Sequence, residues 1–165
     1  MPGFTTAYEN EFGIAKSETQ DRVQVEELER YPRLVSDKSM GELSPREVGM
    51  QGEAIAALWC EKRGFQLLER NWFSKYGEAD IIARDGDTIV LVEVKTRLDL
   101  GDKLGLYPEM AVIPAKLARY RNMALLYICE HPGCFSARFD VVAVTIVSEE
   151  LARLHYLDNV YLWED

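Results

Sequence analysis

The sequence has few of the residues that build zinc sites and disulfide frameworks. It contains two histidines and three cysteines, Cys60, Cys129 and Cys134. The cysteines show no CxxC spacing, and their odd number does not fit a framework of paired disulfides. Free thiols in a reducing compartment are therefore expected, and a histidine-based zinc or di-iron centre is disfavoured. Any metal in this protein would be held by carboxylates.

Long apolar runs and an excess of basic charge are also missing. No stretch approaches the roughly 18 apolar residues that a membrane span requires. The first residues, 1–13, lack the basic and apolar regions of a signal peptide. We therefore expect a cytoplasmic protein with no membrane partner. The net charge of -9 argues against broad adhesion to nucleic acid, because that mode needs basic residues that displace phosphate counterions. Binding to nucleic acid would require a local basic patch.

One globular domain preceded by a tail fits a chain of 165 residues of which 47% are hydrophobic. Residues 1–43 mix charged residues with Gly, Pro and Ser and show no sustained period, so they are predicted to form a flexible acidic extension. A short helical turn over Val23–Arg30 is an option within it. The predicted domain covers residues 44–165.

The predicted order of elements in that domain is αβββαββ, which makes the fold class α/β. Ser44, Pro45 and Glu47 provide the start signal of a helix that runs to about Arg63, with Gly64 as its stop. Apolar patterns and turn residues then predict strands over 65–74, 78–84 and 87–97, a loop over 98–110, a helix over 114–130, and strands over 135–147 and 154–163.

The middle hairpin carries the most informative polar residues. Asp85-Gly86 suits a tight turn, because both central positions tolerate positive φ. The predicted cross-strand pairs are Arg84 with Asp87, Asp80 with Leu91, and Glu78 with Glu93. Since side chains alternate along a strand, Asp80, Glu93 and Lys95 should share one face, with diagonal neighbours about 7–8 Å apart. Two carboxylates within reach of one cation predict a site for Mg²⁺ or Mn²⁺.

Such a site suits the hydrolysis of phosphodiester bonds. A cation neutralises the charge that develops on the phosphate, while Lys95 orients the attacking water or stabilises the phosphate. The alternative is a cross-strand salt network in which Glu93 and Lys95 only satisfy each other, since an isolated ExK pattern is common. The spacing by itself leaves both interpretations open.

Several short motifs follow one another in a fixed order along the domain. They are Gly49-x-x-Gly52-Glu53-x-x-Ala56, Gly64-Phe65, Arg70-Asn71, Gly77-Glu78-Ala79-Asp80, Glu93-Val94-Lys95-Thr96-Arg97, Lys116 and Arg138-Phe139-Asp140-Val141-Val142. This ordered set resembles the YraN family of small bacterial proteins, which is similar to the PD-(D/E)xK, restriction-endonuclease-like nucleases. The resemblance implies an αβββαβ core with a mixed central sheet flanked by helices. It also implies a DNA substrate, branched or single-stranded DNA included.

The resemblance assigns roles to four residues. Asp80, Glu93 and Lys95 occupy the catalytic aspartate, glutamate and lysine positions, and Glu53 matches a helix glutamate that often joins the metal site. On a helical wheel Glu53 lies about 160° from the apolar stripe of its helix, which ordinarily marks an exposed residue. Small neighbours such as Ala57 leave room for the sheet to approach on that side, so both positions of Glu53 stay open.

Several basic residues could bind phosphates, some of them beside aromatic residues such as Tyr120. They are Arg70, Lys75, Arg97, Lys103, Lys116, Arg119 and Arg121, of which Arg97 and Lys116 match family positions. For most of them the alternative is an ordinary solvated surface. Asp140 is predicted to be a structural partner of Arg138 or Arg97.

Two functions compete at this point. The first is a metal-dependent endonuclease that acts on DNA with Mg²⁺ or Mn²⁺. The second is a catalytically inactive nucleic-acid-binding or protein-interaction scaffold with the same fold, which the acidity of the chain favours. A homodimer is compatible with either.

Overall fold

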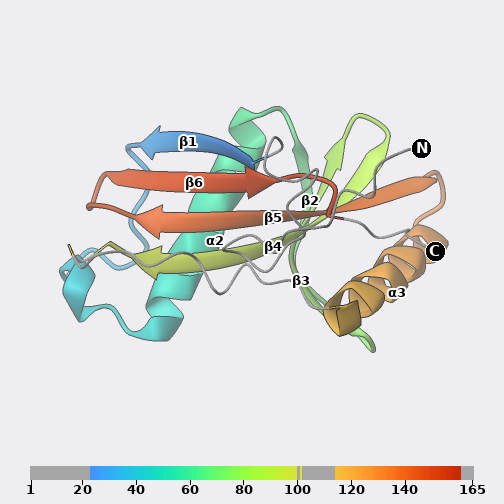
Figure 1. Cartoon of the computed structure of the whole chain (residues 1–165), viewed down its shortest axis with the longest axis horizontal. Helices are drawn as coiled ribbons and strands as arrows, with labels where there is room; N and C mark the ends of the chain where they lie inside the picture. Colours follow the sequence, from blue (N-terminus) through green and yellow to red (C-terminus); the bar gives the residue numbers. More distant parts are fainter. Residues whose placement is uncertain (1–22, 100, 102–113, 161–165) are drawn as a thin grey trace, which may run out of the picture.

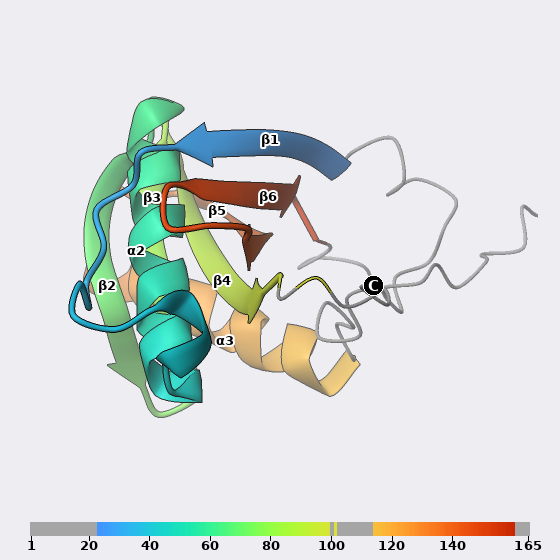
Figure 2. The same ribbon diagram turned by 90° about the vertical axis from the view of Figure 1, so that its left-hand side faces the viewer.

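A single mixed sheet organises the protein, and helices cover both of its faces. The computed structural model describes residues 23–99, 101 and 114–160. The sheet has six strands in the order β1-β6-β5-β4-β3-β2. Neighbouring strands pair antiparallel, except for β4 and β5, which are parallel. This mixed sheet flanked by two helices confirms the predicted α/β class and is consistent with a restriction-endonuclease-like core (Figures 1 and 2).

The elements follow the predicted order, with a strand and a short 3-10 helix added at the start. In chain order they are β1 (Val23–Glu29), the short 3-10 helix η1 (Met40–Glu42), α2 (Pro45–Lys62), β2 (Gln66–Ser74), β3 (Gly77–Asp85), β4 (Thr88–Leu98), α3 (Pro114–Glu130), β5 (Ser136–Ile146) and β6 (Leu151–Leu157). None of the helices in the described ranges is long and apolar enough to cross a membrane.

The start of α2 follows the predicted capping signal. The Ser44 hydroxyl accepts a hydrogen bond from the Glu47 amide at 3.3 Å, and the Glu47 carboxylate accepts one from the Ser44 amide at 2.8 Å. This reciprocal pair satisfies two amides that the first helical turn leaves without helical partners. The helix ends before Gly64, whose φ of 89° is one that glycine adopts without strain.

Two separate cores lie on the two faces of the sheet. Ile55 and Trp59 of α2 pack with Val90 and Val92 of β4 on one face. Tyr120, Met123 and Tyr127 of α3 belong to the other core, together with Ile89 and Leu91 of the same strand. Since neighbouring residues of β4 enter opposite cores, the strand is covered on both sides, as its unbroken apolar run predicted.

The middle hairpin differs from its predicted register by two residues. Asp85 pairs with Thr88, so Gly86 and Asp87 form the turn, and Ile82 rather than Asp80 faces Leu91. The Asp85-Gly86 turn and the pairs built on it were therefore wrong. Gly86 has a φ of 59° and takes the first central position of the turn, a position that a primed turn fills with a residue of positive φ. A shift of two keeps the alternation of faces along the strand.

Two other expectations need correction. Residues Val23–Glu29 form a strand that pairs antiparallel with β6, not a helical turn, so the segment before Ser44 supplies an edge of the sheet. The last strand spans Leu151–Leu157, earlier than the predicted range of 154–163. Its start is set by long-range pairing with β5 and β1, which the local pattern does not contain. Most of the predicted loop over 98–110 lies outside the described residues.

Helix α2 approaches the sheet most closely at Gly52. A Cβ atom built on Gly52 would lie 1.7 Å from the Thr96 Oγ1 and 2.5 Å from the Thr96 Cβ on β4. A rotamer change at Thr96 cannot move its Cβ, so a side chain at position 52 would push the helix away from the strand. Gly49, one turn earlier on the same helix, has open space instead: nothing in the described part of the chain lies within 4 Å of the position that its Cβ would take.

A buried ion-pair network closes one end of the sheet. Asp140 of β5 is fully buried, and it accepts hydrogen bonds from Arg138 Nε at 3.1 Å, from the Tyr156 hydroxyl, and from the Asn159 amide at 2.8 Å. Arg138 also donates to Asp85 at 2.8 Å. The predicted structural pairing of Asp140 with Arg138 is confirmed.

We expect Gly52→Ala to destabilise the protein by about 1–3 kcal/mol, because the added methyl group overpacks the contact between α2 and β4. Gly49→Ala is the matched control on the same helix, and it should raise stability by up to about 1 kcal/mol through helix propensity alone. Denaturant unfolding of both variants measures the difference. Equal effects of the two substitutions would contradict the close approach at Gly52.

We expect Asp140→Ala to cost about 3–5 kcal/mol, since it leaves the half-buried charge of Arg138 without its buried partner. The control is Asp85→Ala, which removes the more exposed partner of the same arginine and should cost about 1 kcal/mol or less. Thermal unfolding followed by circular dichroism compares the two. A similar loss from both variants would show that burial of Asp140 does not decide the effect.

Candidate active site

The site forms where β3 and β4 stop pairing with each other. The ladder between them runs from Asp85 and Thr88 to Ile81 and Val92, so Asp80 and Glu93 are the next residues of their strands. The Val94 amide donates a hydrogen bond of 2.7 Å to Asp80 Oδ2. Where the two strands stop pairing, the Val94 amide therefore donates to the Asp80 side chain.

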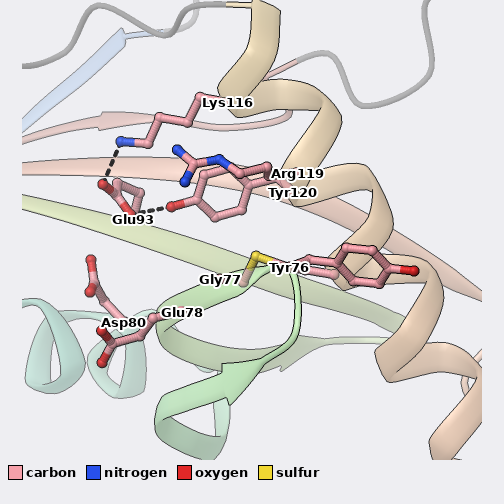
Figure 3. A pocket seen from close by; sticks show the side chains of 9 residues that line it. Tyr76, Gly77, Glu78, Asp80, Glu93, Lys116, Arg119 and Tyr120 are labelled. Atoms are coloured by element: carbon pink, nitrogen blue, oxygen red, sulfur yellow. Dashed lines mark hydrogen bonds and ion pairs between the residues drawn. The ribbon is translucent and has the colours of Figure 1, made fainter.

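The regular alternation of β3 breaks at the same residue. Ala79 packs in the core on the α3 side, whereas Ile81, two positions further, packs in the core on the α2 side. On the neighbouring strand, Asn71 lies between the paired residues Arg70 and Trp72 and has a φ of 50°. With these irregularities in β3 itself and in the neighbouring β2, the Asp80 carboxylate points toward Glu93 rather than into either core, as Figure 3 shows.

Glu93 is surrounded by donors from its own strand and from α3. Its Oε1 lies 2.8 Å from Lys95 Nζ and 2.7 Å from Lys116 Nζ, and its Oε2 accepts a hydrogen bond from the Tyr120 hydroxyl. The side chain of Glu93 is only 12% exposed. Two ammonium groups on one carboxylate offset the cost of its burial, and they leave a cationic rim around the acid.

The pKa shifts of the two acids have opposite directions. Burial raises the pKa of Asp80 well above its ordinary value, and the negative charge of Glu93 raises it further against the Val94 hydrogen bond. Burial also acts to raise the pKa of Glu93, but the hydrogen bonds from Lys116, Lys95 and Tyr120 outweigh burial and lower it. The site thus holds one well-compensated carboxylate beside one that lacks a cation of its own.

Helix α2 brings Glu53 to the edge of this site. With its amide nitrogen facing the acids, Asn71 donates to Glu53 Oε2 and to Glu78 Oε1, each at 3.3 Å. Burial raises the pKa of Glu53, and the positive charge of Arg70 opposes the increase. Glu53 is therefore partly buried and faces the sheet, which decides between the two positions that the sequence left open. Asn71 links α2, β2 and β3 at this point.

The residues fit a cation held by two carboxylates better than one held by three. Among the residues that the structure describes, no group of three or more His, Cys, Asp or Glu side chains could hold a metal ion. Mg²⁺ is usually bound through one or two carboxylates, with water and substrate phosphates as its other ligands. Asp80 has Oδ1 free of the Val94 bond, and Glu93 would have to exchange one of its ammonium partners for the ion.

A cavity of about 280 Å³ opens over the two acids (Figure 3). Its walls come from the turn between β2 and β3 and from α3, and its floor is formed by Asp80 and Glu93. The residues are Tyr76, Gly77, Glu78, Asp80, Glu93, Lys116, Arg119, Tyr120 and Met123. A small substrate group could reach Asp80 and Glu93 from this side, between the turn and the helix.

The structure distributes the predicted phosphate-binding residues unevenly. Lys116 lies in the site, where its ammonium group pairs with Glu93. Arg70 lies near Glu53 and acts on its charge. Lys75 is in the turn between β2 and β3, 5.0 Å above the ring of Tyr76. Arg97 is further along β4, with its Nε 3.4 Å from Thr145 Oγ1.

Two residues that the structure places at the site had no functional role predicted from the sequence. The pattern of its helix places Tyr120 on an apolar stripe, yet its hydroxyl reaches Glu93. Asn71 belonged to a motif without a stated role, whereas Arg119 was among the candidate phosphate-binding residues. The spacing of Lys116, Arg119 and Tyr120 places them on adjoining parts of one helix face, which was the available signal.

Comparisons with known proteins place these residues in one family. The model of the Uncharacterised protein family UPF0102 matches residues 52–144, a range that holds every site residue described above. A UPF0102 protein of Syntrophus aciditrophicus is 48% identical over 102 residues, which cover 61% of this chain and 78% of the relative. One of Beutenbergia cavernae is 43% identical over 114 residues, or 68% of this chain and 94% of the relative. One of Syntrophomonas wolfei is 38% identical over 117 residues, or 70% and 98%.

The family match agrees with the motifs that resemble the YraN family. Those motifs supply the carboxylates, the lysines and the asparagine that converge beyond the end of the β3–β4 ladder. The chain belongs to the UPF0102 (YraN) family.

Proposed function

We propose that this protein is a metal-dependent nuclease that hydrolyses phosphodiester bonds in DNA. One observation carries the proposal: Asp80 and Glu93 lie side by side at the floor of an open cavity, with Lys95 Nζ 2.8 Å from Glu93. Two carboxylates and an amine at one accessible point are the groups that cation-assisted phosphate chemistry requires. A salt network with only a structural role would not need the uncompensated Asp80 beside it.

Asp80 and Glu93 would hold Mg²⁺ or Mn²⁺, both of which prefer hard oxygen ligands. When bound, the ion supplies positive charge against the phosphate oxygens as negative charge builds up on them. Glu53 supports the site from α2 by adding negative charge near Asp80, which favours a cation there.

The lysines have separate tasks in this proposal. Lys95 donates to Glu93 and lies near Asp80, so its ammonium group is placed to orient the attacking water or to stabilise the charge on the phosphate. Lys116 shares Glu93 Oε1 with Lys95, and the Tyr120 hydroxyl holds Oε2, so these donors fix the orientation of the carboxylate. Without these donors the buried carboxylate would be free to turn away from Asp80.

We expect Asp80→Asn to lower Mg²⁺-dependent cleavage of DNA by at least about 100-fold, a loss of about 2.7 kcal/mol of transition-state stabilisation. The matched control is Asp87→Asn, an identical change at the exposed turn of the same hairpin, and it should keep full activity. Gel assays on single-stranded, branched and duplex substrates measure both. Equal activity of the two variants would overturn the assignment, and no cleavage with either metal by the unmodified protein would favour the scaffold alternative.

The same substitution should raise stability when no metal is present. Asparagine keeps an oxygen that accepts from the Val94 amide and removes a charge that Glu93 repels. We therefore expect the Tm of Asp80→Asn in chelator to rise, by about 2–4 °C for each kcal/mol of added folding stability. Saturating Mg²⁺, at about 100 times its Kd, should stabilise the unmodified protein by about 2.7 kcal/mol and leave the variant unchanged. Calorimetry that showed no shift with Mg²⁺ in the unmodified protein would contradict the metal site.

A further inference from the structure

The two walls of the cavity over Asp80 and Glu93 differ in charge. Lys116 and Arg119 stand on the α3 wall, and Glu78 and Tyr76 stand on the opposite wall at the turn between β2 and β3. Glu78 is exposed there. Figure 3 shows the basic groups on one side of the floor and Glu78 on the other. The α3 wall therefore attracts phosphate, whereas the carboxylate of Glu78 repels it at one point of the opposite wall.

Among the residues that the structure describes, Arg119 is the base on this wall that no carboxylate pairs with. Lys116 pairs with Glu93, whereas the described residues provide no ion pair or hydrogen bond for the exposed guanidinium of Arg119. Figure 3 draws that guanidinium beside the ring of Tyr120, on the same side as the Lys116 ammonium group. Arginine presents several donors in a planar fork that matches a phosphate, so Arg119 is suited to hold a phosphate next to the scissile one.

The wall at the turn offers aromatic surface, next to one positive charge. Tyr76 lines the cavity, and Lys75 Nζ lies 5.0 Å above its ring. Nucleic-acid bases stack on such rings whatever their sequence. The wall at the turn would therefore favour the base of a nucleotide over its phosphate.

From this asymmetry we infer that the cavity selects single-stranded DNA, with the phosphate backbone along Arg119 and Lys116 and the bases toward Tyr76. The inference rests on the proposed nuclease function of the same site and adds its substrate class. A single strand carries its charge on one side and its bases on the other, which matches the two walls.

A duplex matches the cavity poorly for two reasons. It carries a phosphate backbone on both of its outer sides, so one backbone would meet the carboxylate of Glu78. At about 280 Å³, the cavity is also near the small end of the size range of ligand pockets, which suits one nucleotide and not two paired strands. In addition, the chain has a net charge of -9, and the sequence-independent binding of duplex DNA depends on many basic contacts.

The test measures binding and cleavage separately with the full chain. Fluorescence anisotropy in chelator compares a labelled single-stranded oligonucleotide with a duplex of the same length at fixed salt. We expect the single strand to bind at least about tenfold more tightly, and Arg119→Gln to weaken its binding about tenfold, which corresponds to about 1.4 kcal/mol for one charge-assisted contact. Arg46→Gln, which removes the same charge from an exposed residue in the first turn of α2, is the matched control and should bind as the unmodified protein does.

Each outcome separates this inference from the proposed function. Duplex binding as tight as single-strand binding, or no effect of Arg119→Gln, would overturn the inference even if Mg²⁺-dependent cleavage occurs. Tight single-strand binding that depends on Arg119, without any cleavage, would support the substrate class and overturn the nuclease activity. A change of Glu78→Gln that improves duplex binding more than single-strand binding would further support the repelling wall.

Discussion

The proximity of two carboxylates, Asp80 and Glu93, is the constraint on which the rest of the site depends. Two buried negative charges repel each other, and the protein compensates for only one of them fully. Glu93 has the ammonium groups of Lys95 and Lys116 and the hydroxyl of Tyr120, whereas Asp80 has the Val94 amide. The remaining negative charge is a local cost to stability, which is the arrangement expected where a cation is bound for function.

The sheet makes this arrangement possible because the two strands are covered on both faces up to the last pair of their ladder. Successive apolar residues of β4 enter the α2 core and the α3 core alternately. This packing holds the two strands rigidly along the stretch where they pair with each other. Beyond Ile81 and Val92 the pairing ends, and the next residues are the two acids. Each strand stays paired with its other neighbour beyond this point, β3 with β2 and β4 with β5. This pairing holds the two carboxylates close together against their repulsion.

The same geometry reconciles an acidic chain with the proposed nucleic-acid substrate. Lys116 and Arg119 of α3 place two positive charges next to the acids. Such a distribution gives little general affinity for DNA and a local attraction for one phosphate backbone. The match to the UPF0102 family model includes this region of the chain. Strand β1, which pairs with β6 at the edge of the sheet, lies outside the matched residues.

Local signals in the sequence predict most of the elements and the face that the hairpin residues share. The Ser44–Glu47 capping box starts α2, and the alternation along β4 places Glu93 and Lys95 on one face, which the register error of two residues at Gly86 does not change. The tertiary structure sets which distant groups reach Glu93, because Lys116 and Tyr120 come from a helix 23 and 27 residues away. The tertiary structure also turns Glu53 toward the sheet and makes a strand, β1, from residues before Ser44. Both results depend on packing between elements, which a local sequence pattern does not contain.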